Sequence, residues 1–172
     1  MLKRFLSILL ILLLCTGVLG CGGTTNLVKV ENGEFTAKPE EIIEILNQQA
    51  KTYSEKTREN ILHIPDFEAS GELLELGGDI SFAFETGESG NTQEITLQWY
   101  FHSKNEESLG SAGFYTSRIP LLFSSKWIDL RKELGIKDSY ELVWEDCIDG
   151  DVHYEFFERD RTCILDISPI EK

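Results

Sequence analysis

The stretch ISFAFETGESGNTQEITLQWYF (residues 80–101) decides the fold. Apolar residues alternate with small or polar ones from Ile80 to Phe84 and again from Ile95 to Phe101, on either side of a turn-rich segment at 86–91. A period of two predicts a strand with one buried face, and two such strands joined by a Gly-rich turn predict an antiparallel hairpin. The dry face of this hairpin needs a cover, which the flanking segments can supply.

The segment before the hairpin predicts a helix over residues 39–57. Pro39 suits a first helical turn, and the following Glu40 and Glu41 complement the positive end of a helix. Thr36 or Lys38 is the expected cap. One stripe at helical spacing follows, made of Ile42, Ile43, Leu46, Ala50 and Tyr53. Residues 67–76 predict a strand between this helix and the hairpin.

The segment after the hairpin predicts further helix. Apolar residues between Ser108 and Leu134 favour one helix over 109–124, bent or started by Pro120, and a shorter one over 126–134. Gly135 is typical of a helix end.

The last part of the chain predicts three more strands. Period two returns in three runs, at 142–144, 152–156 and 163–167. Asp149-Gly150 predicts a two-residue turn between the first two runs, and Arg159-Asp160 or its neighbours predict the next turn.

The elements therefore follow the order helix, three strands, helical segment, three strands, or α-βββ-α-βββ. This order predicts an α+β fold with helices packed on one face of an antiparallel sheet. In element order alone it is similar to cystatin-like and related folds, in which a helix lies on a curved sheet. We expect residues 35–172 to form this single domain.

Residues 1–20 have the three parts of a secretory signal peptide. Lys3 and Arg4 begin it, an apolar run follows from Phe5 to Leu14, and small residues end it. The run is too short for a membrane span, which needs about 20 apolar residues. The next stretch, Val18-Leu19-Gly20-Cys21, resembles the lipobox of bacterial lipoproteins. The resemblance implies a diacylglyceryl group on the sulfur of Cys21 and cleavage just before it.

Lipid attachment at Cys21 would hold the protein on the extracytoplasmic side of a cell membrane or outer membrane. Two or more buried acyl chains anchor a protein stably, whereas a single chain holds it only reversibly. Residues 21–34 are rich in Gly, Thr and Asn and are expected to form a flexible tether. The lipid would then be the contact with the membrane.

The charge of the chain is strongly negative. It contains 16 Lys and Arg against 30 Asp and Glu, a formal charge of −14. Residues 1–20 hold two of the basic residues and no acidic one, so the charge after processing is −16. This acidity argues against nucleic-acid binding, which needs basic residues against phosphates. It also disfavours a flat contact with anionic lipid.

Two cysteines, Cys147 and Cys163, remain in the predicted domain besides Cys21. In an exported protein they invite a disulfide. If Asp149-Gly150 is the turn, Cys147 pairs with Val152, and Cys163 lies one strand further, across from about Phe156. Two strand spacings are about 9–10 Å, whereas a disulfide needs Cα atoms within about 7 Å. A longer, irregular loop at 146–151 would permit the bridge, so both states stay open.

The sequence contains no recognisable motif for catalysis, cofactor binding or metal binding. His63, His102 and His153 are far apart, and none has a second ligand at metal spacing. Residues 145–151 are the densest acidic stretch but lack the ligand spacing of a calcium loop. Asp and Glu are so numerous that no pair stands out as general acid and base. Phosphate-loop, dinucleotide and nucleophile-elbow patterns do not occur.

These observations predict an envelope-exposed interaction module whose partner is another envelope or extracellular protein with a basic surface. Tyr100 and Phe157 fall on the wet faces of their predicted strands and would line a groove if the sheet curves. Two alternatives stay open. One is a small-molecule carrier or sensor with a pocket on the second face of the sheet. The other is an enzyme assembled from dispersed carboxylates and His102 or His153.

Overall fold

The computed structural model describes residues 27–100, 103–123, 128–135 and 144–170. The predictions for the signal peptide, for Cys21 and for His102 lie outside these residues. In the described ranges, no helix combines the length and the apolar character that crossing a membrane requires.

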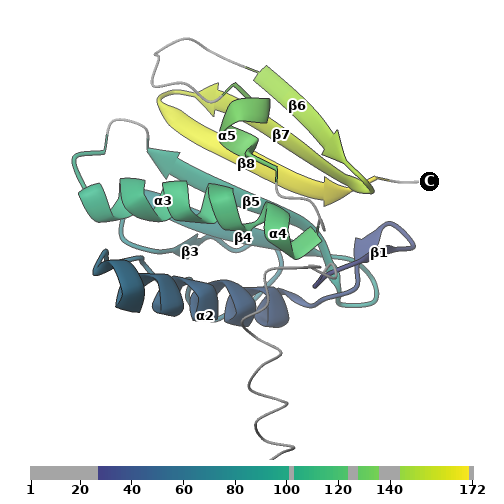
Figure 1. Ribbon diagram of the computed structural model, residues 1–172. Helices are drawn as coiled ribbons and strands as arrows, with labels where there is room; N and C mark the ends of the chain where they lie inside the picture. Colours follow the sequence, from purple (N-terminus) through teal and green to yellow (C-terminus); the bar gives the residue numbers. More distant parts are fainter. Residues whose placement is uncertain (1–26, 101–102, 124–127, 136–143, 171–172) are drawn as a thin grey trace, which may run out of the picture.

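In the described part of the chain, six strands form one antiparallel sheet (Figure 1). Their order across the sheet is β3-β4-β5-β8-β7-β6. Each half of the chain thus contributes three consecutive strands, and the last strands of the two halves, β5 and β8, pair in the middle. The strands are β3 (Leu74–Glu75), β4 (Ile80–Thr86), β5 (Thr92–Tyr100), β6 (Trp144–Asp149), β7 (Val152–Arg159) and β8 (Thr162–Pro169).

The described helical segments lie on one face of this sheet (Figure 1). They are α2 (Pro39–Thr57), α3 (Glu106–Arg118), α4 (Pro120–Phe123) and α5 (Leu130–Glu133). The predicted α+β class and the α-βββ-α-βββ order are therefore confirmed, and the bounds predicted for the first helix agree with those of α2. The likeness to cystatin-like folds stays a prediction.

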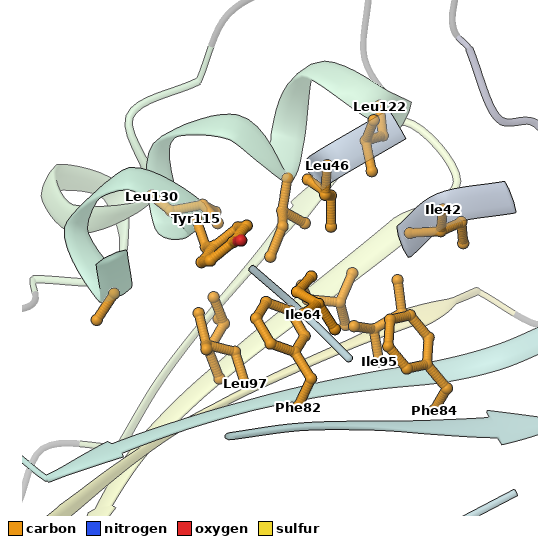
Figure 2. Packing of buried hydrophobic residues seen from close by; sticks show 14 of the residues in the cluster. Ile42, Leu46, Ile64, Phe82, Phe84, Ile95, Leu97, Tyr115, Leu122 and Leu130 are labelled. Atoms are coloured by element: carbon orange, nitrogen blue, oxygen red, sulfur yellow. The ribbon is translucent and has the colours of Figure 1, made fainter. Parts of the chain in front are cut away.

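The core lies between the helices and the covered face of the sheet. Figure 2 shows Phe82 and Phe84 of β4 pointing toward the helices, in the same layer as Ile95 and Leu97 of β5. All four are fully buried. The ring of Tyr115 in α3 meets Phe82 edge-on, with centroids 5.1 Å apart. Burying one such large apolar side chain contributes about 1.5–3 kcal/mol, so this layer holds the helices against the sheet.

Local sequence explains where the two long helices begin and end. At the start of α2, the backbone N–H of Lys38 donates to the Glu41 carboxylate at 2.9 Å, and Arg58 ends the helix in the left-handed region at φ 64°. At the start of α3, the side chain of Asn105 accepts hydrogen bonds from two backbone N–H groups. Pro120 then separates α3 from α4, because proline lacks the N–H that a continuing helix needs.

The predicted tether over residues 21–34 is wrong in its C-terminal part. Strands β1 (Val30–Glu31) and β2 (Glu34–Phe35) form a short hairpin instead. Asn32 and Gly33 have φ values of 55° and 75°, as a two-residue turn with two left-handed positions requires. Val28 and Phe35 are buried, and the Val28 N–H donates to the Leu122 carbonyl at 2.8 Å. The folded domain therefore begins by Val28 and not at residue 35.

Three other predicted boundaries need correction. Only Leu74–Glu75 of the predicted strand 67–76 is in the sheet. The side chain of Ser70 bonds the preceding part to β4 instead, through Glu85 and the N–H of Thr86. The helix predicted from residue 109 starts at Glu106, because Asn105 provides the cap. The described part of the helix predicted over 126–134 is helical only from Leu130 to Glu133.

Candidate functional site

The sheet has a second face, on which no described helix lies. The residues that point to it alternate with the core positions, are partly or fully exposed, and do not belong to the core cluster. We call this surface the open face. Its members are Ser81, Ala83 and Glu85 of β4; Glu94, Thr96, Gln98 and Tyr100 of β5; Thr162, Ile164, Asp166 and Ser168 of β8; His153, Glu155 and Phe157 of β7; and Asp146 and Ile148 of β6.

Three carboxylates stand side by side on neighbouring strands of the open face. Glu155 of β7 pairs with Asp166 of β8 on one side and with Asp146 of β6 on the other. We call Asp146, Glu155 and Asp166 the acidic row. Directly paired residues have Cβ atoms about 4.5–5.5 Å apart, and like charges in such positions destabilise a sheet. The row therefore works against the stability of the fold.

Two residues of β5 continue this acidic surface. The hydroxyl of Thr96 donates a hydrogen bond of 2.6 Å to Asp166. Glu94 pairs with Glu85 of β4, which is a third like-charge pair on the open face. Burial raises the pKa of Glu94 most, and the nearby charges of Asp166, Glu85 and Glu155 raise it further. Burial also raises the pKa of Asp166, against the opposing effect of the Thr96 hydrogen bond.

Little positive charge balances these carboxylates. His153 Nε2 lies 3.4 Å from Asp146 Oδ2. Among the described residues, no Lys or Arg forms an ion pair with the acidic row, and Arg159 is paired with Asp160 at the end of the hairpin. The open face is thus a negatively charged surface.

Apolar side chains border the acidic row on both sides. Phe157 and Ile164 form the next cross-strand pair, two residues along each strand from the row. On the other side of the row, Ile148 lies two residues from Asp146 along β6, and 64% of its surface is exposed. The prediction that Tyr100 and Phe157 lie on the wet side of the sheet is confirmed, since both are on the open face and both are partly exposed.

A shallow concavity of about 250 Å³ lies at one end of the open face. Tyr100 lines it, as the groove prediction expected, and Phe157 does not. Its lining is completed by Gly78, Asp79, Ser81, Gln98, Trp99 and Thr162.

A larger groove of about 490 Å³ lies away from the open face, between α2 and the segment 63–67. Asn47 fixes this segment, because its amide both donates to the Ile64 carbonyl and accepts from the Ile64 N–H, each at 2.8 Å. Ile43 and Phe67 supply its apolar lining. Its polar lining is Glu40, Glu44, Asn47, Gln48, Lys51, His63 and Asp66.

Comparisons with protein-family models, with curated proteins and with solved structures found no match for this chain.

The histidines and the acidic turn do not form a metal site in the described residues. His63 lies at the groove beside α2 and His153 on the open face. Residues 145–151 form most of β6 and its turn. Within the described ranges, no group of three or more His, Cys, Asp or Glu side chains is arranged to hold a metal ion.

Cys147 and Cys163 are free thiols. Both belong to the covered side of the sheet, but Cys147 pairs with Tyr154, whereas Cys163 pairs with Glu158 at the other end of β7. Burial, and then nearby acidic groups, raise the pKa of Cys147 to about 11 and that of Cys163 to about 12. Since the thiolate is the nucleophile, neither is suited to nucleophilic chemistry at neutral pH.

The turn predicted before β7 is displaced by one residue. The loop is Gly150–Asp151, with Asp149 paired to Val152, and not Asp149–Gly150. The turn after β7, predicted at Arg159-Asp160 or its neighbours, is Asp160–Arg161, where both residues have positive φ. A turn displaced by one residue moves every cross-strand partner by two residues. Cys147 therefore pairs with Tyr154 and not with Val152, and Cys163 pairs with Glu158, two residues from the predicted position near Phe156.

Sequence reasoning missed the acidic row for the same reason. Its members are 9 and 11 residues apart, and nothing local links them. Glu155 and Asp166 do alternate with apolar residues of predicted strands, which is a signal for the wet face. Asp146 instead follows the predicted run at 142–144 in phase with Trp144, so the sequence pattern did not place it on that face. Only the true turn positions show that the three are neighbours.

Proposed function

We propose that this protein is a membrane-anchored interaction module of the cell envelope and that the open face contacts its protein partner. The acidic row is the observation that supports this most. Paired like charges lower the stability of a sheet, and sites that break the rules of stable folding are typically functional. A basic partner surface would neutralise the row, and binding would weaken with added salt.

The anchor in this proposal is the lipid on Cys21, and the location is the extracytoplasmic side of a membrane. Support comes from the lipobox-like sequence and from the short distance between the anchor and the domain. Six residues lead from Cys21 to Leu27, the first described residue. Fully extended, they span at most about 20 Å. The partner surface would then lie close to the membrane as well.

Site-specific photo-cross-linking in cells would test the contact surface. A photoreactive amino acid replaces Gln98, Ser81 or Ser168 on the open face, and Glu55 or Lys56 on the exposed side of α2 as matched controls. We expect one discrete protein adduct from the open-face positions and none from α2. Adducts only from α2 would move the contact surface there, and the absence of any adduct would argue against an interaction module.

The anchor has its own test. Cys21→Ala should release the protein from the membrane fraction and abolish labelling by a radioactive fatty acid. If the variant stays membrane-bound or remains labelled, Cys21 is not the lipidation site. Loss of the photo-adduct in the same variant would show that anchoring is needed to reach the partner.

A small-molecule carrier is the second candidate, and the groove beside α2 favours it. Its volume of about 490 Å³ is in the usual range of ligand sites. A ligand that binds there should raise the melting temperature of the wild type and have less effect on Ile43→Ala. Equal shifts in both proteins would place the ligand elsewhere.

A further inference from the structure

The partner of the open face has to satisfy its own backbone hydrogen bonds. In the interior of a sheet the strand N–H and C=O groups are already used in the ladder, so a face offers side chains only. An extended segment laid on it would leave its own N–H and C=O groups unpaired, which is costly wherever water is excluded. A helix satisfies them internally. Strand addition suits an edge of the sheet, whereas a helix suits the face.

The spacing of the acidic row also matches a helix. Neighbouring strands are about 4.8 Å apart, so the row from Asp146 to Asp166 spans about 9.6 Å. Along a helix, positions i and i+7 are about 10.5 Å apart, with i+3 or i+4 between them. Along an extended chain, positions i and i+4 on one side are about 13 Å apart. Three basic residues on one helix face therefore meet three carboxylates with little adjustment.

The apolar neighbours of the row require a second stripe on the same helix. Phe157 and Ile164 lie two residues along their strands from the row, which is about 6.7 Å. Adjacent stripes on a helix surface lie at comparable distances. A helix crossing the strands would thus place basic side chains over the acidic row and apolar side chains over this pair.

We infer that the open face docks a basic amphipathic α-helix of a partner protein, lying across β6, β7 and β8. Lys or Arg at i, i+3 or i+4, and i+7 face Asp146, Glu155 and Asp166, and an adjacent apolar stripe covers Phe157 and Ile164. This inference rests on the proposed role of the open face. A second copy of this chain is a poor occupant, because its net charge, −16 after processing, repels the row.

Two synthetic peptides of identical composition test the inference. One places lysines at i, i+4 and i+7 beside a stripe of leucines; the other alternates lysine and leucine so that they segregate only in an extended chain. Each is titrated against full-length protein in neutral phosphatidylcholine vesicles, with empty vesicles subtracted. We expect the helical peptide to bind at least tenfold more tightly, and its affinity to fall as salt is added.

Variants locate the binding. Glu155→Gln with Asp166→Asn should weaken binding of the helical peptide about tenfold. Glu40→Gln with Glu55→Gln on α2, which removes the same charge, should change it less than twofold. Equal loss in both double variants would mean attraction to net charge alone and would overturn the inference.

The peptide titration tests whether the occupant is a helix, and the cross-linking experiment tests whether the open face contacts a protein at all. Equal or tighter binding of the alternating peptide, or binding of neither peptide, would overturn the helix as occupant. If the open-face photo-adduct still formed, the interaction module itself would stand. Without an adduct, both would fail.

Discussion

The two faces of the central sheet are built from alternating residues of the same strands, yet they follow opposite rules. On the covered face Phe82, Leu97 and Leu165 have no exposed surface, and neighbours across strands attract. On the open face Asp146, Glu155 and Asp166 are neighbours that repel. Stable folding thus explains the residues of the covered face but not the paired carboxylates of the open face. Four measurements test this difference.

The largest expected effect is a truncation on the covered face. Phe82→Ala should lower the free energy of unfolding by about 3–5 kcal/mol, because it leaves a cavity beside Tyr115. Its neighbour Ser81, which points to the open face, provides the matched control. Ser81→Ala should change stability by no more than about 0.5 kcal/mol. Urea unfolding followed by tryptophan fluorescence measures both, and similar losses would erase the distinction between the faces.

A smaller effect separates two buried tyrosines. The hydroxyl of Tyr115 donates to the Leu62 carbonyl at 2.7 Å, whereas the buried hydroxyl of Tyr154 has no hydrogen-bond partner among the residues that the structure describes. Tyr115→Phe should cost about 1–2 kcal/mol, since it leaves a carbonyl unpaired. Tyr154→Phe removes an unsatisfied group and should be neutral or stabilising. If the second variant proved as costly as the first, Tyr154 would have a partner in solution.

On the open face, a substitution should raise the stability of the protein instead of lowering it. Glu155→Gln removes the central charge of the acidic row and should stabilise the protein by about 0.5–1 kcal/mol. Glu55→Gln on the exposed side of α2 is the control and should leave stability nearly unchanged. A destabilised Glu155→Gln protein would show that the carboxylate makes favourable contacts within its own chain. The row would then be structural, and its role in partner binding would lose its main support.

Sequence patterns predicted those parts of the molecule that depend on local spacing. Helix α2 was predicted with its observed bounds, because proline, two glutamates and an apolar stripe all act within one segment. The faces of β4 and β5 were predicted because the period of two is local as well. The hairpin β1–β2 was missed, although Asn32-Gly33 is a strong turn signal, because short flanking segments gave no strand pattern.

The acidic row depends on non-local information. Under the predicted turn at Asp149-Gly150, Asp146 would lie opposite His153, a favourable pair. The turn lies one residue later, and Asp146 lies opposite Glu155 instead. A displacement of one residue thus places a like charge directly opposite Asp146, while its contact with His153 becomes a diagonal one. Register is set by turn geometry together with the packing of both faces, and a single sequence does not reveal the second of these.

The smallest expected effect is a dependence of stability on pH that belongs to the open face. Burial raises the pKa of Glu94 and that of Asp166, each above the ordinary value for its own residue type. A raised folded-state pKa means that the folded protein binds protons more tightly than the unfolded chain. The stability contributed by protonation is complete below the unfolded-state pKa and is lost as the pH rises through the folded-state pKa.

The wild type should therefore be more stable near pH 5 than at pH 7, which urea unfolding at a series of pH values would measure. Asp166→Asn removes one of the two groups. It also lowers the pKa of the other, because among the neighbouring charges that of Asp166 raises the pKa of Glu94 most. Its stability should change less between pH 7 and pH 5 than that of the wild type. Glu55→Gln should keep the wild-type slope. If Asp166→Asn kept it too, the pH dependence would come from the net charge of the chain, and the open face would carry no special electrostatic strain.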